Sequence, residues 1–260
     1  MTFFVLGIDA ATWKVIDSNL GDLRYFGRLK EVCKSDTMVL EQEPLSPLIW
    51  CGMFSGAYPS EHGHREFVGG DGDIVKREDI PVDFIWDELD NDFDVRAINV
   101  PFVVPTFSFN DDFEAPGFGL PTDPDEWSSE LNEVTERSLE LLDKDPDVLI
   151  SVYTSLDRVQ HFHWGSSKVL KWYRRLDEKL GELLFDSGFL EEKDNSLIVV
   201  SDHGFCSFGE ADVQTLPKET ENGELEGDHD KNAILMTKNI EFEIKEPQDI
   251  YRSIKNRFMG

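Results

Sequence analysis

The sequence predicts an α/β fold in which helices cover both faces of a mainly parallel sheet. Short apolar runs alternate with amphipathic stretches along the chain, which is the order of repeated strand–helix–strand units. The run Val148–Ser155 is too apolar for an edge strand, as expected of a strand buried on both faces. A chain of 260 residues is also within the reach of one α/β domain with one core. We therefore expect residues 1–260 to form a single domain.

The first half of the chain contains two predicted strands and two predicted helices. Phe3–Ile8 is an unbroken apolar run and predicts the first strand. A helix is expected within Trp13–Val32, because apolar residues recur at helical spacing at Leu20, Leu23, Phe26 and Leu29. Val95–Val100 predicts the next strand. The helix Pro124–Leu142 follows Thr122 and Asp123, residue types found at helix starts, and its expected buried side consists of Trp127, Leu131, Val134, Leu139 and Leu142.

The second half continues the alternation. After the strand Val148–Ser155, the predicted elements are the helix Lys168–Leu184, the strands Ser196–Ser201 and Ala233–Met236, and the closing helix Pro247–Phe258. Two segments break the pattern. Pro101–Pro124 is rich in Phe, Pro, Gly and Asp, and Cys206–Asp228 is polar and acidic. Both follow directly after strands, so we expect them to shape a pocket.

The charge balance is strongly acidic. Asp and Glu number 53 against 25 Lys and Arg, a formal net charge of −28, and the acidic residues are spread over the whole length. Nucleic acid and anionic membranes would be repelled, so neither is expected as a partner. A dispersed acidic excess with 40% hydrophobic residues is typical of a salt-adapted protein, which predicts a halophilic source. The regular apolar runs argue against disorder, the other interpretation of high charge.

Cysteine usage and hydropathy restrict the compartment and the chemistry. Cys33, Cys51 and Cys206 are odd in number and lack C-x-x-C spacing, which disfavours a disulfide framework and a thiolate zinc site. The segment Met1–Gly7 has no positively charged start and is followed by Asp9, so it resembles neither a signal peptide nor a membrane span. No later run approaches the ~20 apolar residues of a membrane helix. A cytoplasmic location is expected by default.

Two motifs carry paired ligand types. Asp157 and His161 are four residues apart, which places both side chains on one face of a helical turn. A carboxylate and an imidazole can bind one divalent ion such as zinc, although the spacing alone equally fits a surface ion pair or a helix cap. Asp202-His203-Gly204 ends an apolar strand. Burying this ionisable pair is costly unless another group compensates for it, which favours a functional role.

Three further residues each have a plain structural interpretation. Asp9 ends the first strand and could serve as a helix N-cap. Ser46 precedes Pro47, a residue favoured in the first helical turn, so Ser46 is predicted at the N-cap of that helix. The same position offers backbone N–H groups and a positive dipole end to a phosphate. His229, in Gly227-Asp-His-Asp230, could be an ordinary loop histidine.

Taken together, these residues indicate a metal-binding site. Open α/β sheets bind ligands beyond the carboxyl ends of their strands, where residues distant in sequence can meet. If the fold unites them, Asp157, His161 and His229 can hold one ion, and Asp9, Asp202 and His203 another. The Ser46 oxygen would then lie between the ions and a phosphorus atom. Two ions ~4 Å apart can activate such a nucleophile and neutralise charge on a phosphate ester.

The order of these motifs resembles the alkaline phosphatase superfamily, in its type I phosphodiesterase/nucleotide pyrophosphatase branch. The resemblance covers nearly the full chain. Its motifs are Asp9, then Pro44-x-Ser46-Pro47-x-x-Trp50 with Gly56 and Pro59-x-x-His62-Gly63, then Asp157-x-x-x-His161, Asp202-His203-Gly204 and His229. Asn99-Val-Pro101 with Pro116-Gly-Phe118, and Tyr173-x-x-x-Asp177 with Gly181, also resemble that branch.

The resemblance implies a central mixed sheet, two divalent ions and a transiently phosphorylated serine. The ions would be Zn²⁺, with Mn²⁺ as the alternative. Ser46 would be the nucleophile and, with Asp9, Asp202 and His203, would surround one ion, while Asp157, His161 and His229 would hold the other. The chain is short for this branch, so a large cap domain is expected to be absent. Pro101–Pro124 and Cys206–Asp228 would then supply most substrate contacts.

The chain departs from the family at one position. Nucleotide pyrophosphatases place a phosphate-binding Asn shortly after the H-G step, and Phe67 takes that place here. This puts nucleotide phosphodiesterase activity in doubt and leaves Arg65, His64 and Asn99 as candidate phosphate contacts, although surface or packing roles suit each of them. Hydrolysis of a small phosphodiester or phosphomonoester through a phosphoserine is the favoured function. Phosphoryl transfer, as in the related mutases, and a non-catalytic metal-bound module are the alternatives.

Overall fold

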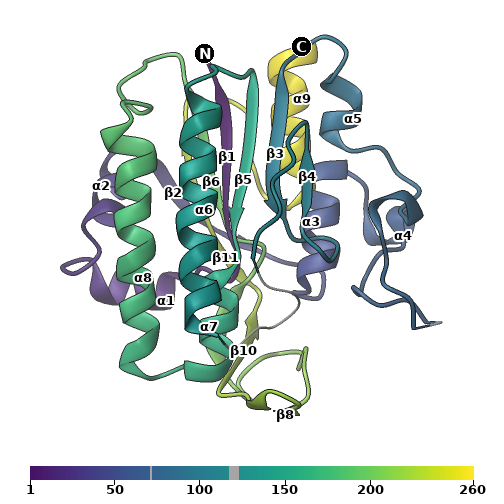
Figure 1. The fold of residues 1–260 in the computed structure, drawn as a ribbon, viewed down its shortest axis with the longest axis vertical. Coiled ribbons are helices and arrows are strands. Elements are labelled where there is room, and N and C mark those ends of the chain that lie inside the picture. The colour runs from purple at the N-terminus through teal and green to yellow at the C-terminus, as the bar shows by residue number, and fades with distance from the viewer. Residues whose placement is uncertain (71, 117–122) are drawn as a thin grey trace.

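The computed structural model describes residues 1–70, 72–116 and 123–260. Within these residues, the main element is a seven-stranded sheet in the order β2-β11-β6-β1-β5-β3-β4, which runs through the middle of the molecule (Figure 1). β6, β1, β5 and β3 are parallel neighbours, whereas β11 and β4 pair antiparallel with theirs. The strands are β1 (Phe3–Ile8), β2 (Lys34–Val39), β3 (Val95–Val100), β4 (Phe107–Phe109), β5 (Val148–Tyr153), β6 (Ser196–Val200) and β11 (Asn232–Lys238).

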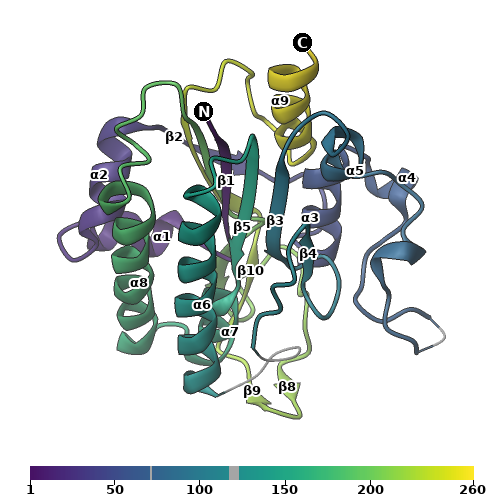
Figure 2. The same ribbon diagram turned by 45° about the horizontal axis from the view of Figure 1, so that its top comes forward.

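Helices cover both faces of this sheet (Figure 2). One face packs against α2 (Arg24–Val32), α6 (Pro124–Leu142) and α8 (Ser167–Leu180), and the other against α3 (Ser46–Ser55), α5 (Ile85–Leu89) and α9 (Gln248–Met259). Side chains alternate across a strand, so the uniformly apolar β1 serves both layers. Phe4 and Leu6 are buried in the first core, and Phe3 and Val5 in the second. The predicted mixed, mainly parallel sheet with helices on both faces is therefore confirmed.

The remaining elements are short and connect or extend this core. The short helices are α1 (Trp13–Ile16), α4 (Pro59–His62), α7 (Ser155–His163), η1 (Asp17–Asn19), η2 (Arg77–Asp79) and the π-helical turn η3 (Gly181–Asp186). Two antiparallel pairs lie outside the main sheet: β7 (Gly204–Ser207) with β10 (Gly227–Asp230), and β8 (Glu219–Thr220) with β9 (Gly223–Glu224). No large cap domain is present among the described residues, as the sequence predicts.

A glycine in β1 brings α3 close to the sheet. A Cβ atom at Gly7 would lie 2.6 Å from the ring of Trp50 and 2.9 Å from Val152. Both distances are well below ordinary carbon contacts, so any larger residue would push α3 away from the strand. Since α3 begins with Ser46, Gly7 helps to set the height of that serine above the carboxyl end of β1.

Most predicted elements are confirmed, with differences at their ends. β1, β3 and α6 have the predicted limits. The strand predicted to reach Ser155 ends at Tyr153, because Ser155 opens α7, and the strand predicted to reach Ser201 ends at Val200. The strand predicted at Ala233–Met236 is longer in the structure, where β11 spans Asn232–Lys238. The closing helix α9 is shifted by one residue from the prediction. The helix predicted to end at Leu184 ends at Leu180 and continues as η3.

In the first half, one expectation is wrong and one strand was not predicted. Leu20 does not belong to the helical face, because α2 begins only at Arg24 and Leu20 is partly exposed in the preceding turn. The strand β2 was not expected, because four of its six residues are exposed and it lies at the edge of the sheet. Edge strands with polar, exposed side chains lack the apolar pattern that reveals a strand. Gly117, Phe118 and Thr122, which the motif and cap predictions include, lie outside the described residues.

Two further observations concern the compartment expectations. Cys33, Cys51 and Cys206 are buried free thiols, in agreement with the absence of a disulfide pattern. Within residues 1–70, 72–116 and 123–260, no helix has the length and hydropathy needed to cross a bilayer.

Candidate active site

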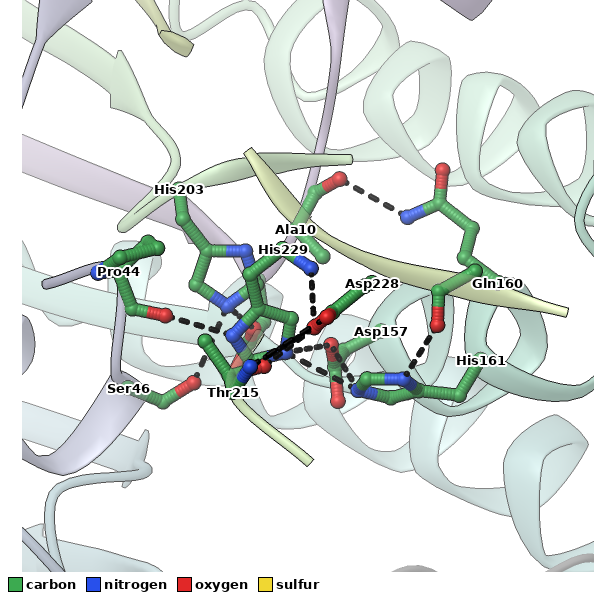
Figure 3. A network of polar contacts seen from close by, with 12 residues as sticks. Ala10, Pro44, Ser46, Asp157, Gln160, His161, His203, Thr215, Asp228 and His229 are labelled. Carbon is green, nitrogen blue, oxygen red and sulfur yellow. Dashed lines mark hydrogen bonds and ion pairs between the residues drawn. The ribbon is translucent and has the colours of Figure 1, made fainter. Parts of the chain in front are cut away.

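The topology gathers the predicted residues at one edge of the sheet. β6, β1 and β5 are parallel neighbours, so their carboxyl ends lie side by side. Asp9 follows β1, Asp157 lies in the helix that follows β5, and Asp202 and His203 follow β6. Figure 3 shows Asp157, His161, His203 and His229 with their side chains directed toward one centre, and Ser46 beside it. The crevice beyond the carboxyl ends is where α/β sheets of this kind bind ligands.

Asp157, His161 and His229 form the first group. The Oδ1 atom of Asp157 lies 3.3 Å from the Nε2 atoms of both His161 and His229, and these two Nε2 atoms are 3.0 Å apart. Ligand atoms at 2.0–2.1 Å from a tetrahedral zinc ion are separated by roughly 3.3 Å. The three atoms therefore have the spacing of one metal site. The helical i,i+4 relation predicted for Asp157 and His161 is present in α7.

The second group consists of Asp9, Asp202, His203 and Ser46. The Nε2 atom of His203 lies 3.6 Å from Oδ1 of Asp9, 3.3 Å from Oδ2 of Asp202 and 3.3 Å from Oγ of Ser46. The ring of His203 also stacks on that of His229 with centroids 3.7 Å apart, so the two groups adjoin. His203 shares ligand-range spacing with both groups.

Backbone carbonyls orient the three imidazoles. Nδ1 of His229 lies 2.6 Å from the carbonyl oxygen of Pro44, Nδ1 of His161 lies 3.2 Å from that of Gly227, and Nδ1 of His203 lies 2.9 Å from that of Gly204. A carbonyl oxygen can only accept, so each Nδ1 carries a proton, and the Nε2 of a neutral imidazole in this orientation presents its lone pair to the centre. This arrangement is the usual support of metal-binding histidines.

A short ribbon holds His229 in register with His203. β10 pairs with β7 so that His229 lies opposite Phe205, two residues after His203. Gly204, between them, has no room for a side chain, because an added Cβ would collide with the carbonyl oxygen of Asn232. The glycine of the Asp202-His203-Gly204 motif is thus required by close backbone approach.

Three carboxylate oxygens in the site lack partners. Oδ1 of Asp9, Oδ1 of Asp157 and Oδ2 of Asp202 are buried without a hydrogen-bond donor in the described part of the chain. These are the same atoms that face the imidazole Nε2 atoms. Orphaned buried carboxylate oxygens are costly, and divalent cations bind oxygen and imidazole nitrogen donors together. The donor set therefore fits metal ions.

Two of these three carboxylates, Asp9 and Asp202, have raised pKa values, which reflects a deficit of positive charge around them. Burial and the nearby carboxylates of Asp202 and Asp157 hold the pKa of Asp9 well above its usual value. Burial and Asp157 raise the pKa of Asp202 to about 6. Burial acts in the same direction on Asp157, but His161 and His229 outweigh it and hold the pKa of Asp157 well below its usual value. A bound cation would favour the ionised form of all three carboxylates.

The position of Ser46 differs from the prediction. Leu45, with φ −109° and ψ 121°, is the N-cap of α3, and Ser46 is the first helical residue. Its hydroxyl makes no capping bond and instead lies toward His203. Asp9 is not a cap either, since the side chain of Thr12 caps α1. The cap interpretation is therefore wrong for both residues, and their side chains are left for the site.

A cavity of about 600 Å³ opens at this centre. Five of the seven predicted site residues line it, namely Asp9, Ser46, Asp157, His161 and His229. Half of the other lining residues come from the two predicted pocket loops, at positions 101, 103–106 and 213–216, and the rest include the segment 65–68 and Arg158. The expectation that these loops shape the pocket is confirmed for the described residues.

Each of the three alternative phosphate contacts has a partner within the protein. Arg65 is exposed, lines the cavity and forms an ion pair with Glu43, which lines the cavity too. His64 is buried, with Nε2 2.5 Å from the carbonyl oxygen of Phe102. Asn99 is fully buried and donates to Glu130 and to the carbonyl oxygen of Val152.

The sequence prediction passed over two ionisable residues beside the site. Arg158 lies within the Asp157-x-x-x-His161 motif and lines the cavity, although only 7% of its surface is exposed. Glu130 is fully buried in α6, three residues after Trp127. A charged residue on the apolar stripe Trp127, Leu131 and Val134 is a signal that could have identified Glu130.

The metal fit makes a prediction about stability. In protein freed of metal by EDTA, Asp202→Asn is expected to raise the melting temperature, because it removes one buried charge while its amide oxygen can still accept from the N–H of Ala10. The gain should be on the order of 1–3 kcal/mol. In Zn²⁺-loaded protein the same substitution should lower the melting temperature, because a carboxylate ligand is lost. Paired melting curves measure both signs.

Asp228→Asn is the matched control for this experiment. Asp228 is equally buried, but its carboxylate accepts from Thr215 and from the N–H of His229. Its substitution should destabilise the protein with and without metal. A melting temperature of Asp202→Asn that shifts in the same direction in both conditions would contradict the cation centre.

Solved structures share this architecture. Murine ectonucleotide pyrophosphatase/phosphodiesterase 5 superposes with a TM-score of 0.67 at 13% identity, covering 99% of this chain and 95% of that chain. An inactive variant of that protein in complex with AMP gives 0.67 at 14%, covering 98% and 94%. Phosphonoacetate hydrolase from Sinorhizobium meliloti 1021, in complex with phosphonoformate, gives 0.58 at 17%, covering 86% and 59%. At these identities the likeness concerns the fold. A search of curated protein sequences found no match.

The class of the protein follows from the family match together with the predicted motif order: it is an enzyme of the alkaline phosphatase superfamily. Within that superfamily the chain belongs to the type I phosphodiesterase / nucleotide pyrophosphatase family, whose profile matches residues 3–252. It is therefore a hydrolase of ester bonds from a metal-dependent family. The family predicted from the motif order is confirmed.

Proposed function

We propose that residues 1–260 form one catalytic domain that hydrolyses small phosphate esters, diesters or monoesters, through a phosphoserine on Ser46. The observation that carries the proposal is the position of the Ser46 hydroxyl. It lines the cavity and lies 3.3 Å from Nε2 of His203, beside both ligand groups. Asp9, Asp202 and His203 would hold one divalent ion, and Asp157, His161 and His229 a second. We propose Zn²⁺ for both, with Mn²⁺ as the alternative.

The reaction would proceed in two displacements at phosphorus. In the first, Oγ of Ser46 gives its proton to solvent and bonds to phosphorus as the P–O bond to the leaving group breaks, and the departing oxygen takes up a proton from solvent. In the second, the oxygen of a water molecule bonds to phosphorus and gives a proton to solvent while the Oγ–P bond breaks, and Oγ takes up a proton to regenerate the serine. The bound ions would supply Lewis-acid stabilisation of charge on the oxygens around phosphorus. The position of Ser46 in the first turn of α3 adds the positive end of the helix dipole.

The cavity walls indicate the kind of leaving group. Beyond the charged site, the lining is mainly apolar and includes Phe67, Val103, Val104 and Leu216. Apolar walls favour an ester whose leaving group has an aromatic or aliphatic part. The murine neighbour was solved with AMP, whose base is one such group. No observation within the described residues favours a mutase or a non-catalytic module.

A substrate screen tests the proposed function. Zn²⁺- or Mn²⁺-loaded protein in high salt should hydrolyse nitrophenyl phosphate or bis-nitrophenyl phosphate faster than nitrophenyl sulfate, because the Ser46-Pro47 motif lacks the C/S-x-P-x-R pattern of sulfatases. The ratio of the two phosphate-ester rates assigns the ester class. Folded, metal-loaded protein that hydrolyses neither phosphate ester would contradict the proposal.

A further inference from the structure

Arg158 is a buried cation in the wall of the candidate active site. It lies in α7 directly after Asp157 and one helical turn before Phe162. Only 7% of its surface is exposed, yet it lines the cavity together with Asp9, Ser46 and Asp157. The charge of Arg158 therefore lies next to the cavity although the side chain is almost fully removed from solvent.

The guanidinium group of Arg158 has donors to spare. Nη1 is buried without a hydrogen-bond partner, and no ion pair involves Arg158 in the part of the chain that the structure describes. Arginine remains charged at all physiological pH values, so it cannot relieve its burial by losing a proton. A buried charge without partners is unfavourable, which indicates that its partner is a ligand.

Glu130 compensates the charge of Arg158 without forming an ion pair with it in the described part of the chain. Burial raises the pKa of Glu130, and the positive charge of Arg158 opposes this rise. The Oε1 atom of Glu130 accepts from Asn99 and from the backbone N–H of Thr154, at 3.0 and 2.7 Å, whereas its Oε2 atom is buried without a donor. Nη1 of Arg158 therefore remains without an acceptor.

We propose that Arg158 binds the phosphoryl group, donating hydrogen bonds to its non-bridging oxygens in the substrate and in the phosphate product. The proposal rests on the proposed function and assigns the oxyanion contact of that site. The planar guanidinium matches two oxygens of a phosphate at once. Phe67, at the position of the family asparagine, has no donor to offer. Arg158, in α7, supplies the hydrogen-bond donors instead.

The experiment measures binding of inorganic phosphate to Zn²⁺-loaded protein by calorimetry. Arg158→Gln should weaken phosphate binding about 10- to 100-fold, the range for a hydrogen bond to a charged group. The variant should also raise KM for nitrophenyl phosphate and keep the wild-type metal content. Arg158→Lys keeps the positive charge but cannot donate two parallel hydrogen bonds, so it should give an intermediate loss of phosphate affinity. Added guanidinium ion should restore part of the activity of Arg158→Gln.

Arg174→Gln is the control for loss of one positive charge. Arg174 pairs with Asp22 on the surface, where both side chains are half exposed, and it does not line the cavity. Its phosphate affinity should equal that of the wild type. If Arg158→Gln does not fold, Arg158→Lys decides, since it preserves the buried charge beside Glu130.

Unchanged phosphate affinity in a folded Arg158 variant would overturn the proposal, even if its melting temperature falls. Different results would contradict the proposed function and the role of Arg158. Wild-type protein that binds phosphate through Arg158 but hydrolyses no ester would contradict the proposed function alone. Protein that hydrolyses esters equally well with and without Arg158 would contradict the oxyanion contact alone.

Discussion

Ser46→Ala is expected to lose nearly all phosphate-ester turnover, by a factor of about 10⁴ or more, while the protein stays folded with its metals bound. The structure indicates that this substitution removes the hydroxyl group with little effect on the helix. Ser46 is the first residue of α3 rather than its cap, and its hydroxyl makes no capping bond. Alanine is the best helix former, so stability should change little. Loss of activity can then be assigned to the missing nucleophile, with kcat measured on the ester that the wild type prefers.

Ser46→Thr is the matched control, because it retains a hydroxyl group at the same backbone position. It should keep a measurable rate, while Ser46→Gly and Ser46→Asn should behave like the alanine variant. Acid quench during turnover should trap phosphoserine on the wild type and on none of the variants that lack a hydroxyl. A stably folded Ser46→Ala enzyme with near wild-type kcat would rule out the covalent mechanism and leave direct attack by water.

Wild-type protein loaded with Zn²⁺ is expected to bind two ions per chain, and Asp157→Ala or His229→Ala is expected to bind one. Asp157 and His229 each contribute an atom to the first group, where the ligand separations are 3.0–3.3 Å. Loss of one of three protein ligands should weaken that site by more than the 10- to 100-fold typical of outer-shell changes. Elemental analysis after dialysis gives the stoichiometry, and activity should fall with the lost ion.

His163→Ala provides the matched control on the same helix. His163 lies two residues after His161, packs edge-on against Trp127 at 6.2 Å and is absent from both ligand groups. Its variant should keep two ions. A wild-type content of one ion or fewer under saturating Zn²⁺ would contradict the two-ion site and would also remove the basis for assigning Asp9, Asp202 and His203 to a centre of their own.

The sequence predicts the elements that have strong local signals. α6 has its predicted limits because Pro124 and the acidic cap before it define the start, and a long apolar stripe defines the rest. β1 is predicted because its side chains pack in both hydrophobic cores, which makes the strand apolar throughout. β2 carries neither signal: it is an exposed edge strand that owes its conformation to pairing with β11. Such strands are set by tertiary contacts that no local pattern shows.

The ligand-type residues of the candidate site could be predicted from the sequence, but the burial and exact register of its other residues could not. Asp9, Asp157, Asp202 and His203 are ionisable residues at or just beyond the ends of apolar strands, which is a visible conflict within the sequence. Arg158 raises no such signal, because arginine inside a helix is ordinary until its burial is known. The cap assigned to Ser46 shifted by one residue because proline is compatible with both of the first helical positions. Burial and exact register come from packing, which lies beyond local pattern.

The ribbon of β7 and β10 couples the cavity wall to the candidate ligand His229. Strand pairing places His229 beside His203, and the pairing is extended by the bond from the N–H of Phe208 to the carbonyl oxygen of Glu226. Between those two residues lie the β8–β9 pair and the residues 213–216 that line the cavity. Thr215 donates to the carboxylate of Asp228, and the same carboxylate accepts from the N–H of His229. A graft that exchanges this cavity wall therefore has to retain a donor at position 215 if the histidine is to stay in place.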